Sequence, residues 1–325
     1  MHMKATAIAP SNIAFVKYMG RKDEILRLPE NASISMCLSD LLTTTTVEFS
    51  DAFDADNVTI NGEYEDGEAT RVIKHLDRIR SRATVTAKAR VVSTNTFPIG
   101  TGLSSSASGF AALTVAGVAA AGLTLSEREL SILARQGSGS ACRSIPSGFV
   151  LWHDADTSEG SFAETIFPPH HWDIVDVVAI ASSHRKFVTT SDAHIRVANG
   201  PYYGQRIARM PSKIEECQRI LTAKDFHALG QFVEEEALDL HAIFMTAGII
   251  YLTPESLMVI AAVRTWRQEG LNVFFTVNTG QDVHILCERK NVAVLQEKLK
   301  SLACVQKVIV NSPAEGTRLS DKHLF

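Results

Sequence analysis

Residues 98–108 read Pro98-Ile99-Gly100-Thr101-Gly102-Leu103-Ser104-Ser105-Ser106-Ala107-Ser108 and join a strand-like segment, 84–93, to a helix-like segment, 107–121. Glycine lets a backbone approach a phosphate closely, and a helix N-terminus presents unpaired N–H groups and a positive dipole end. Serine hydroxyls add hydrogen bonds or reach a magnesium ion. The order strand, Gly-x-Gly, serines, helix therefore predicts a phosphate-binding loop. The alternative is a flexible Gly/Ser turn that caps a tightly packed, alanine-rich helix.

The composition of the 325-residue chain restricts the class of protein. The chain is 45% hydrophobic and 21% charged, so it can bury a substantial core. With a net charge of −4 and no run of Lys or Arg longer than two residues, no nucleic-acid binding is expected. The five cysteines form no CxxC pair, so we expect reduced thiols. The histidines show no metal-ligand spacing, so we expect no metal-binding residues. Without a signal-peptide pattern or a long apolar span, we expect a cytoplasmic protein that does not associate with membranes.

The hydrophobic pattern predicts two packed lobes of α+β class, with the active site in the cleft between them. The first lobe, 1–182, is rich in strand-like segments and carries the loop; the second, 183–325, is rich in helices. Ser126, with Glu129 three residues on, is the predicted N-cap of a helix. The predicted helices are Thr70–Arg82, Ala107–Ala121, Ser126–Gln136, Pro201–Thr222, Lys224–Ala247, Thr253–Gly270 and Val292–Leu302. The predicted strands are 4–9, 12–18, Thr43–Phe49, Thr84–Ser93, Phe149–His153, Ile174–Ser182, Val273–Val277, Val283–Cys287 and Val305–Val310, the last closing the chain.

Four stretches resemble one family. The loop is similar to the PxxxGLSSSAS loop of the GHMP small-molecule kinases, and Asn95–Pro98 matches the approach to it in one branch, the mevalonate diphosphate decarboxylases. Asn12–Glu24 (NIAFVKYMGRKDE) resembles that family's NIALIKYWGKKDE, and Arg135–Ser144 (RQGSGSACRS) resembles its ARxGSGSACRS. Together these stretches span most of residues 5–155. The resemblance implies a GHMP-kinase-like fold whose first lobe binds ATP. It also implies Mg²⁺ as a second cofactor, a phosphorylated mevalonate as the substrate, and assembly as a homodimer.

Members of this family phosphorylate the 3-hydroxyl of mevalonate 5-diphosphate, and loss of that phosphate with carbon dioxide gives isopentenyl diphosphate. The resemblance implies that Lys17 neutralises charge developing at the reacting hydroxyl and that Arg143 holds the substrate carboxylate. The alternatives are a solvated lysine at a strand end and an interlobe salt bridge. The implied substrate contacts are Asn12, Tyr18, Arg21, Lys22, Ser138, Gly139, Ser140, Arg143 and Thr190. The implied nucleotide contacts are Ser93, Asn95, Pro98, Gly100, Gly102, Leu103, Ser104, Ser105, Ser106 and Ser108, with a simple turn as the alternative for Ser93 and Asn95.

The sequence departs from the family pattern at the catalytic aspartate. The family motif FTxDAGPNV corresponds to Phe275–Val283, FTVNTGQDV, which places Asn278 at the aspartate and Asp282 at the asparagine. A carboxamide cannot accept the hydroxyl proton as a carboxylate does. Either Asp282 reaches the same pocket and supplies the charge, or the chemistry is altered. Arg21 also replaces the usual lysine, and Ser191 stands near the place of a family arginine.

Several activities therefore remain open. Retention of Lys17 and Arg143 favours decarboxylation of mevalonate 5-diphosphate. The changes at Arg21 and Ser191 favour a phosphomevalonate decarboxylase that acts on the 5-monophosphate, and Asn278 favours a mevalonate 3-kinase that does not decarboxylate. A nucleotide-binding regulator without turnover and an engineered Asp-to-Asn substitution are further alternatives. No carboxylate can be assigned to magnesium.

Overall fold

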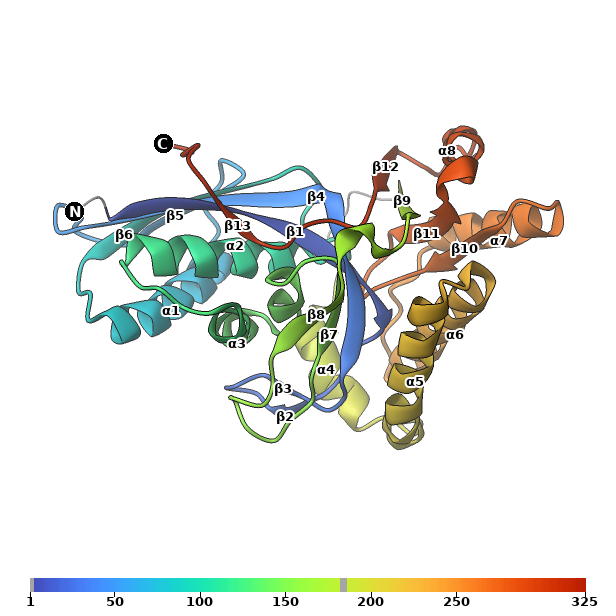
Figure 1. Ribbon diagram of the computed structural model, residues 1–325, viewed down its shortest axis with the longest axis horizontal. Coiled ribbons are helices and arrows are strands. Elements are labelled where there is room, and N and C mark those ends of the chain that lie inside the picture. The colour runs from blue at the N-terminus through green and yellow to red at the C-terminus, as the bar shows by residue number, and fades with distance from the viewer. Residues whose placement is uncertain (1–2, 182–185) are drawn as a thin grey trace.

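The computed structural model describes residues 3–181 and 186–325, whose strands form a sheet of seven, a sheet of four and a two-stranded hairpin (Figure 1). The path through the large sheet is β13-β1-β4-β6-β5, with β7 paired to β4 and β8 to β7. The long strands β1 and β4 pair antiparallel with each other along most of the large sheet. The bounds are β1 Lys4–Val16, β4 Ser33–Ser50, β5 Asn57–Ile60, β6 Lys88–Asn95, β7 Phe149–Trp152, β8 Ala163–Phe167 and β13 Arg318–Ser320.

Three predicted helices, α1 (Asp66–Ala83), α2 (Ser105–Ala120) and α3 (Glu127–Gly137), are confirmed and cover one face of this sheet (Figure 1). The central helix α2 is buried almost all round, because its Ala, Val and Leu side chains meet both the sheet and the neighbouring helices. The predicted N-cap of α3 is also confirmed: Ser126 and Glu129 form a reciprocal capping box. The phosphate loop thus leads into a helix that is fixed by the core.

The four-stranded sheet has the order β10-β11-β9-β12 and carries helices on both faces. Phe274 faces the core that includes α5 and α6, whereas Phe275 faces the core under α7 and α8, as expected from the alternation of a strand. The bounds are β9 Ile174–Ile180, β10 Val273–Thr276, β11 Val283–Glu288, β12 Lys307–Asn311, α4 Thr190–Ala198, α5 Tyr203–Ala223, α6 Phe226–Thr246, α7 Pro254–Gln268 and α8 Val292–Lys300. The remaining elements are the hairpin β2 Arg21–Asp23 and β3 Leu28–Pro29 and the short helices η1 Gly139–Ser144, η2 Pro169–His171 and η3 Arg289–Asn291.

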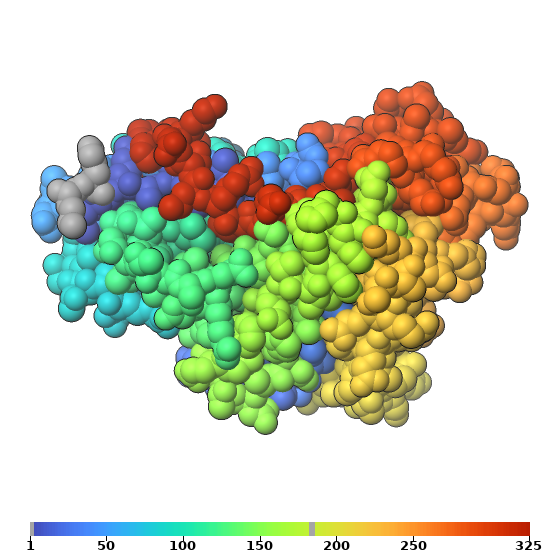
Figure 2. Space-filling view, in the orientation of Figure 1, coloured from blue at the N-terminus to red at the C-terminus, as the bar shows by residue number. Residues whose placement is uncertain are grey.

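The chain crosses between the two sheets twice. Strand β9, expected in the first lobe, pairs with β11 and β12 of the second sheet. The prediction that 305–310 closes the chain is wrong, because β13 returns to pair with β1, and the C-terminal segment lies over the first lobe (Figure 2). Ser182 and the predicted lobe boundary at 182/183 fall outside the described residues, and that boundary stays a prediction.

One apolar core joins the sheets. It combines β1 and β4 side chains such as Phe15 and Ile34 with Phe274 of β10 and Leu229 of α6. The two lobes therefore do not have independent interiors where they meet, and the cleft between them is held by packing. Among the described residues, no helix is long and apolar enough to span a membrane.

This shared core gives a stability prediction. Gly230 of α6 lies against the Phe274 ring, where an added Cβ would sit 2.1 Å from ring carbons. Gly230→Ala is expected to destabilise the protein by about 1–3 kcal/mol through overpacking, although alanine favours helices. Gly204→Ala, at an exposed α5 position with no neighbour within 4 Å, is the control and should leave stability equal or higher. Equal thermal unfolding midpoints for the two variants would contradict the prediction.

Candidate active site

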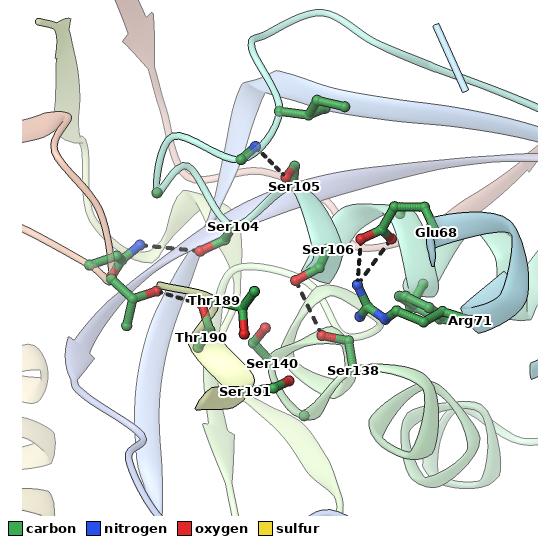
Figure 3. Close-up of a pocket in the computed structure, with 18 of the residues that line it drawn as sticks. Glu68, Arg71, Ser104, Ser105, Ser106, Ser138, Ser140, Thr189, Thr190 and Ser191 are labelled. Carbon is green, nitrogen blue, oxygen red and sulfur yellow. Dashed lines mark hydrogen bonds and ion pairs between the residues drawn. The ribbon is translucent and has the colours of Figure 1, made fainter. Parts of the chain in front are cut away.

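A cavity of about 460 Å³ opens where the phosphate loop, η1, α4 and the turn after β10 meet (Figure 3). Most of the predicted site residues line it: Lys17, Tyr18, Arg21, Ser93, Asn95, Gly100, Gly102, Ser104, Ser105, Ser106, Ser138, Gly139, Ser140, Arg143, Thr190 and Asn278. Predicted site residues outside the lining are Asn12, Lys22, Pro98, Leu103, Ser108 and Asp282. The sequence-based grouping of substrate and nucleotide residues therefore converges on one cavity.

The residues outside the lining have other contacts. Lys22 is exposed and pairs with Asp156 at 2.8 Å, so the structure does not place it with the substrate residues. Leu103 is buried in the core, and Ser108 Oγ lies 2.6 Å from Thr43 Oγ1 inside the sheet. These side chains support the loop from behind.

The phosphate loop is pressed against the turn that follows β10. Gly100 and Gly102 have φ values of 78° and 115°, and a Cβ on Gly102 would meet Gly280 Cα at 2.6 Å. Gln281 N donates to Thr101 O at 3.1 Å. Only glycine permits this backbone approach, so the loop from the first lobe and the turn from the second lobe form one wall.

Serine side chains connect the loop to its surroundings (Figure 3). Ser104 Oγ accepts from Asn278 Nδ2 at 3.2 Å, and Ser106 Oγ lies 3.3 Å from Ser138 Oγ. Ser105 Oγ accepts from Gly100 N at 3.4 Å. The three hydroxyls thus face the cavity at the start of α2, where helix N–H groups favour an anion.

Lys17 follows β1 directly, and only 2% of its surface is exposed. Its Nζ donates to a backbone carbonyl of β1 at 2.7 Å, to Thr276 Oγ1 at 2.8 Å and to Asn278 Oδ1 at 3.2 Å. These acceptors are neutral. Burial lowers the pKa of Lys17 to about 7, while the charge of Glu236 opposes that shift. The ammonium is therefore poised to lose its proton near neutral pH when no anion is bound.

A buried ion cluster on α5 and α6 anchors the main chain of Lys17. Glu236 Oε1 accepts from Lys17 N at 3.0 Å, and Arg206 Nη2 donates to Lys17 O at 3.3 Å. Glu236 also pairs with Arg206 at 2.5 Å and with Lys213 at 2.6 Å. Both polar groups of the Lys17 backbone are thus fixed by the helical part of the second lobe.

Arg143 lies in η1 and is 4% exposed. Nη1 donates to Ser33 Oγ at 2.9 Å and Nη2 to Asn12 Oδ1 at 3.1 Å, so Asn12 acts from behind the cavity. The guanidinium centre lies 5.7 Å from the Trp152 ring centroid. Burial lowers the pKa of Arg143, but a guanidinium stays protonated in proteins. A buried cation with these neutral partners is suited to an anionic group in the cavity.

Asn278 and Asp282 differ in where they lie. Asn278 lines the cavity, whereas Asp282 does not and is only 2% exposed. Asp282 Oδ1 accepts from Ala181 N at 3.2 Å, at the end of β9. The structure thus places Asp282 apart from the pocket, in contrast to the hypothesis that the two side chains share it. A carboxamide occupies the position expected for the base.

Tyr18 and His194 form an aromatic wall on the substrate side. Their ring centroids lie 4.5 Å apart, and His194 Nδ1 accepts from Gly20 N at 2.8 Å. Burial holds the pKa of His194 well below its ordinary value, so its ring is neutral. A Cβ on Gly139 would meet the Tyr18 ring at 2.9 Å, which explains a glycine there. The sequence did not single out His194, because no motif surrounds it and the histidines show no metal-ligand spacing.

Lys186 is a further lining cation, and motif reasoning missed it. Its Nζ donates to Thr190 Oγ1 at 2.6 Å and to Thr279 O at 2.8 Å. Burial lowers the pKa of Lys186 to about 8. It reaches the cavity beside the Asn278 turn from a segment without a distinctive pattern. Further lining residues that were missed are Arg27, Val58, Ile60, Glu68, Arg71, Val72, Val91, Leu113 and Thr279.

Comparison with known proteins identifies the chain. The family model described as diphosphomevalonate decarboxylase-like N-terminal domain matches residues 9–163, and the model described as mevalonate 5-diphosphate decarboxylase C-terminal domain matches residues 176–321. The chain belongs to the diphosphomevalonate decarboxylase family. It is an enzyme of the GHMP-kinase-like α+β fold, which confirms the expected family and fold class.

Relatives and solved structures of this family match nearly the whole chain. The diphosphomevalonate decarboxylase of Candida albicans is 35% identical over 92% of this chain and 87% of its own. The phosphomevalonate decarboxylase of Haloferax volcanii is 34% identical over 96% and 97%. The Staphylococcus aureus mevalonate diphosphate decarboxylase superposes with a TM-score of 0.93 at 34% identity, covering 99% of each chain. A structure described as MDDEF in complex with MVAPP, AMPPCP and magnesium superposes with a TM-score of 0.92 at 33% identity, covering 98% and 99%.

The lowered pKa of Lys17 gives a pH prediction. If the cationic form of Lys17 is the active form, kcat/KM should fall as the pH rises through about 7, because kcat/KM follows the free enzyme. The pH at which kcat falls should be higher than the pH at which kcat/KM falls, because bound anions stabilise the ammonium of Lys17. Both are measured by steady-state kinetics between pH 5.5 and 9 (roughly the range where His and Lys groups titrate). A kcat/KM that rises across this interval would contradict the cationic role.

The ion cluster gives a second prediction. Glu236→Gln removes the carboxylate that opposes the pKa shift of Lys17, so the falling limb of kcat/KM should move to lower pH. Activity at pH 8 should then fall by about tenfold, as one pKa unit implies. Glu235→Gln is the control, since Glu235 is exposed and lies 3.9 Å from Lys213. If both variants fold and show the same pH profile, the prediction that Glu236 raises the pKa of Lys17 is wrong.

Proposed function

We propose that this enzyme decarboxylates mevalonate 5-diphosphate to isopentenyl diphosphate with ATP, through phosphorylation of the 3-hydroxyl. The observation that supports this most strongly is the pair of buried cations Lys17 and Arg143, which line the cavity that also contains the phosphate loop. A simple kinase needs the loop and one cation at the transferring group. A buried guanidinium whose hydrogen-bond partners among the described residues are the neutral Ser33 and Asn12 adds a place for the carboxylate that leaves.

The remaining residues suit the other parts of such a substrate. Tyr18, Arg21 and the stretch 138–140 line the cavity on the side of η1 and offer donors to phosphate oxygens. Thr190 also lines the cavity and accepts a hydrogen bond from Lys186 Nζ at 2.6 Å. The substrate would thus extend from Lys17 and Arg143 toward Arg21, with its reacting hydroxyl beside Asn278.

ATP fits the loop and the apolar slot beside it. The loop combines the glycine φ values and the serine hydroxyls at the start of α2, and Ser93 and Asn95 line the cavity near the slot formed by Val58, Ile60 and Val91. Among the described residues, no cluster of three or more His, Cys, Asp or Glu could hold a metal. Mg²⁺ would therefore be bound mainly by nucleotide phosphates, with Ser104 and Ser105 as available hydroxyls. When bound, it supplies positive charge on the phosphates.

Asn278 determines how the hydroxyl is handled. Its Oδ1 can accept a hydrogen bond from the 3-hydroxyl but cannot keep the proton. Phosphoryl transfer through a loose transition state depends mainly on positioning and charge stabilisation, so the step remains feasible without a carboxylate. As the bond from the 3-oxygen to phosphorus forms and the bond to ADP breaks, the hydroxyl proton passes to an oxygen of the transferred phosphate. Lys17 stabilises the charge on the transferred phosphate. When that phosphate leaves C3, the bond to the carboxyl carbon breaks, and its electrons form the new double bond while Arg143 holds the carboxylate in place.

A second candidate is decarboxylation of the 5-monophosphate. Arg21 is already paired with Glu24 at 2.5 Å, and Ser191, which accepts from Arg21 at 3.5 Å, brings no charge. An arginine that is already paired and an uncharged serine suit fewer phosphate charges. The Haloferax volcanii relative, named phosphomevalonate decarboxylase, matches nearly the full length of both chains. The mevalonate 3-kinase alternative rests on Asn278 alone.

We also propose that the enzyme acts in the cytoplasm as a homodimer. The support is the family, together with the buried or partly buried reduced cysteines expected of a reducing compartment. Size-exclusion chromatography with light scattering measures the assembly directly.

Product analysis tests the proposed function. The protein is incubated with ATP, Mg²⁺ and mevalonate 5-diphosphate, and the products are identified by mass spectrometry. Isopentenyl diphosphate together with carbon dioxide, ADP and phosphate is expected. A 3-phosphorylated product that retains its carboxylate would make the protein a kinase, and turnover of the 5-monophosphate in preference would establish the second candidate. Arg143→Met should lower decarboxylation by at least about 100-fold, since a charged contact to the leaving carboxylate is lost.

Restoring a carboxylate tests the role of Asn278. Asn278→Asp should raise kcat by about tenfold or more, because a positioned base commonly contributes a factor of 10² to 10⁴. It should also move the falling pH limb upward, since the new charge beside Lys17 raises the pKa of that lysine. Asn278→Ala, the control, should lower kcat. A less active Asn278→Asp variant would show that the carboxamide itself is required.

A further inference from the structure

Arg27 is a further cation that lines the cavity, and the charge of Arg21 acts on it. It lies in the turn between β2 and β3 with φ of 54°, a left-handed conformation that costs a non-glycine residue about 1 kcal/mol. Its Nε donates to Gln136 O at 3.2 Å, at the end of α3 and next to the stretch 138–140. The turn thus holds a guanidinium against the cavity beside the residues assigned to the substrate phosphate.

Two cations whose charge acts on Arg27, Arg21 and Arg71, and the nearby hairpin residue Lys22 already have carboxylate partners. Arg21 pairs with Glu24 at 2.5 Å, Lys22 with Asp156 at 2.8 Å, and Arg71 with Glu68 at 2.9 Å. Within the part of the chain that the structure describes, no carboxylate lies within ion-pair distance of Arg27. Its bond to Gln136 leaves the two terminal nitrogens of the guanidinium available.

The surroundings of Arg27 destabilise its charged form. Burial, together with the charges of Arg21 and Arg71, lowers the pKa of Arg27 to about 10. A half-buried positive group beside other positive groups is stabilised when an anion is bound between them. Among these charges Arg21 acts most strongly on Arg27 and Lys17 is not one of them, and Arg27 is bonded to Gln136 beside the stretch 138–140. We therefore assign that anion to the end of the substrate farthest from the reacting hydroxyl.

We propose that Arg27 binds the 5-phosphoryl end of the substrate and is the principal residue that determines affinity for it. The inference rests on the proposed function. Tyr18 Oη and Arg21 Nε, 3.0 Å apart, form one side of the phosphoryl site, and Arg27 forms the other. Its two free terminal nitrogens can bind two phosphate oxygens at once, which a lysine cannot do.

Steady-state kinetics of Arg27→Met test this assignment. KM for the phosphorylated mevalonate should rise by about 10- to 100-fold, the loss expected for charged hydrogen bonds. KM for ATP should stay within about twofold and kcat should change little, since Arg27 does not touch the reacting groups. Arg27→Lys should recover part of the loss. Arg78→Met is the matched control: Arg78 lies half-buried on α1, donates to Lys74 O at 3.3 Å and does not line the cavity.

The outcomes separate this inference from the function on which it rests. Wild-type protein is assayed with mevalonate 5-diphosphate and with the 5-monophosphate. A larger KM effect on the diphosphate assigns Arg27 to the outer phosphate, and an equal effect assigns it to the inner one; both support the inference. Normal wild-type turnover with an unchanged KM in Arg27→Met, or a rise in KM for ATP alone, overturns it. Absence of turnover with either substrate overturns the proposed function and this inference together. If Arg27→Met does not fold, Arg27→Gln provides the same test.

Discussion

The burial of the Lys17 ammonium is the constraint on which the site depends. A charge removed from water must be compensated, and here neutral acceptors surround Nζ, while the hydrogen bond of Glu236 to Lys17 is to the main-chain N–H of that lysine. These partners come from β10, the turn that follows it and α6, so the ammonium stays in place only when the second lobe is docked on β1. The same arrangement leaves its charge uncompensated on the cavity side. Binding of a polyanionic substrate therefore relieves an electrostatic cost that folding has imposed.

Close backbone packing makes the cavity a rigid receptor. Gly102 and Gly280 touch across the two lobes, and the core around Phe15 and Phe274 continues behind them. In this setting a carboxamide at position 278 retains much of the geometry: Asn278 bridges Lys17 and Ser104. What it lacks is the capacity to accept a proton. The arrangement thus separates positioning, which is retained, from general base catalysis, which is not.

Local patterns predicted most of the fold, and the resemblance predicted most of the site. The loop at 98–108 and the helix after it follow from glycine, serine and alanine chemistry, and Arg143 and Lys17 came from contiguous motifs. The misses are of another kind. Strand β13 is short, and its partner β1 lies at the other end of the sequence. Lys186 and Arg27 line the cavity only because the fold brings their segments there, and neither segment carries a recognisable motif. Whether Asp282 could replace Asn278 also depended on side-chain direction across a turn, which spacing alone does not determine.

Lys17 is expected to be largely neutral above pH 7 in the free enzyme and to become charged when the anionic substrate binds. Calorimetric titration with mevalonate 5-diphosphate at pH 8, in two buffers of different ionisation enthalpy, measures the protons taken up on binding. Net uptake by the wild type should exceed that of Lys17→Met by about one proton, because a group with a pKa of about 7 is mostly deprotonated at that pH. Equal proton uptake by wild type and Lys17→Met would contradict it.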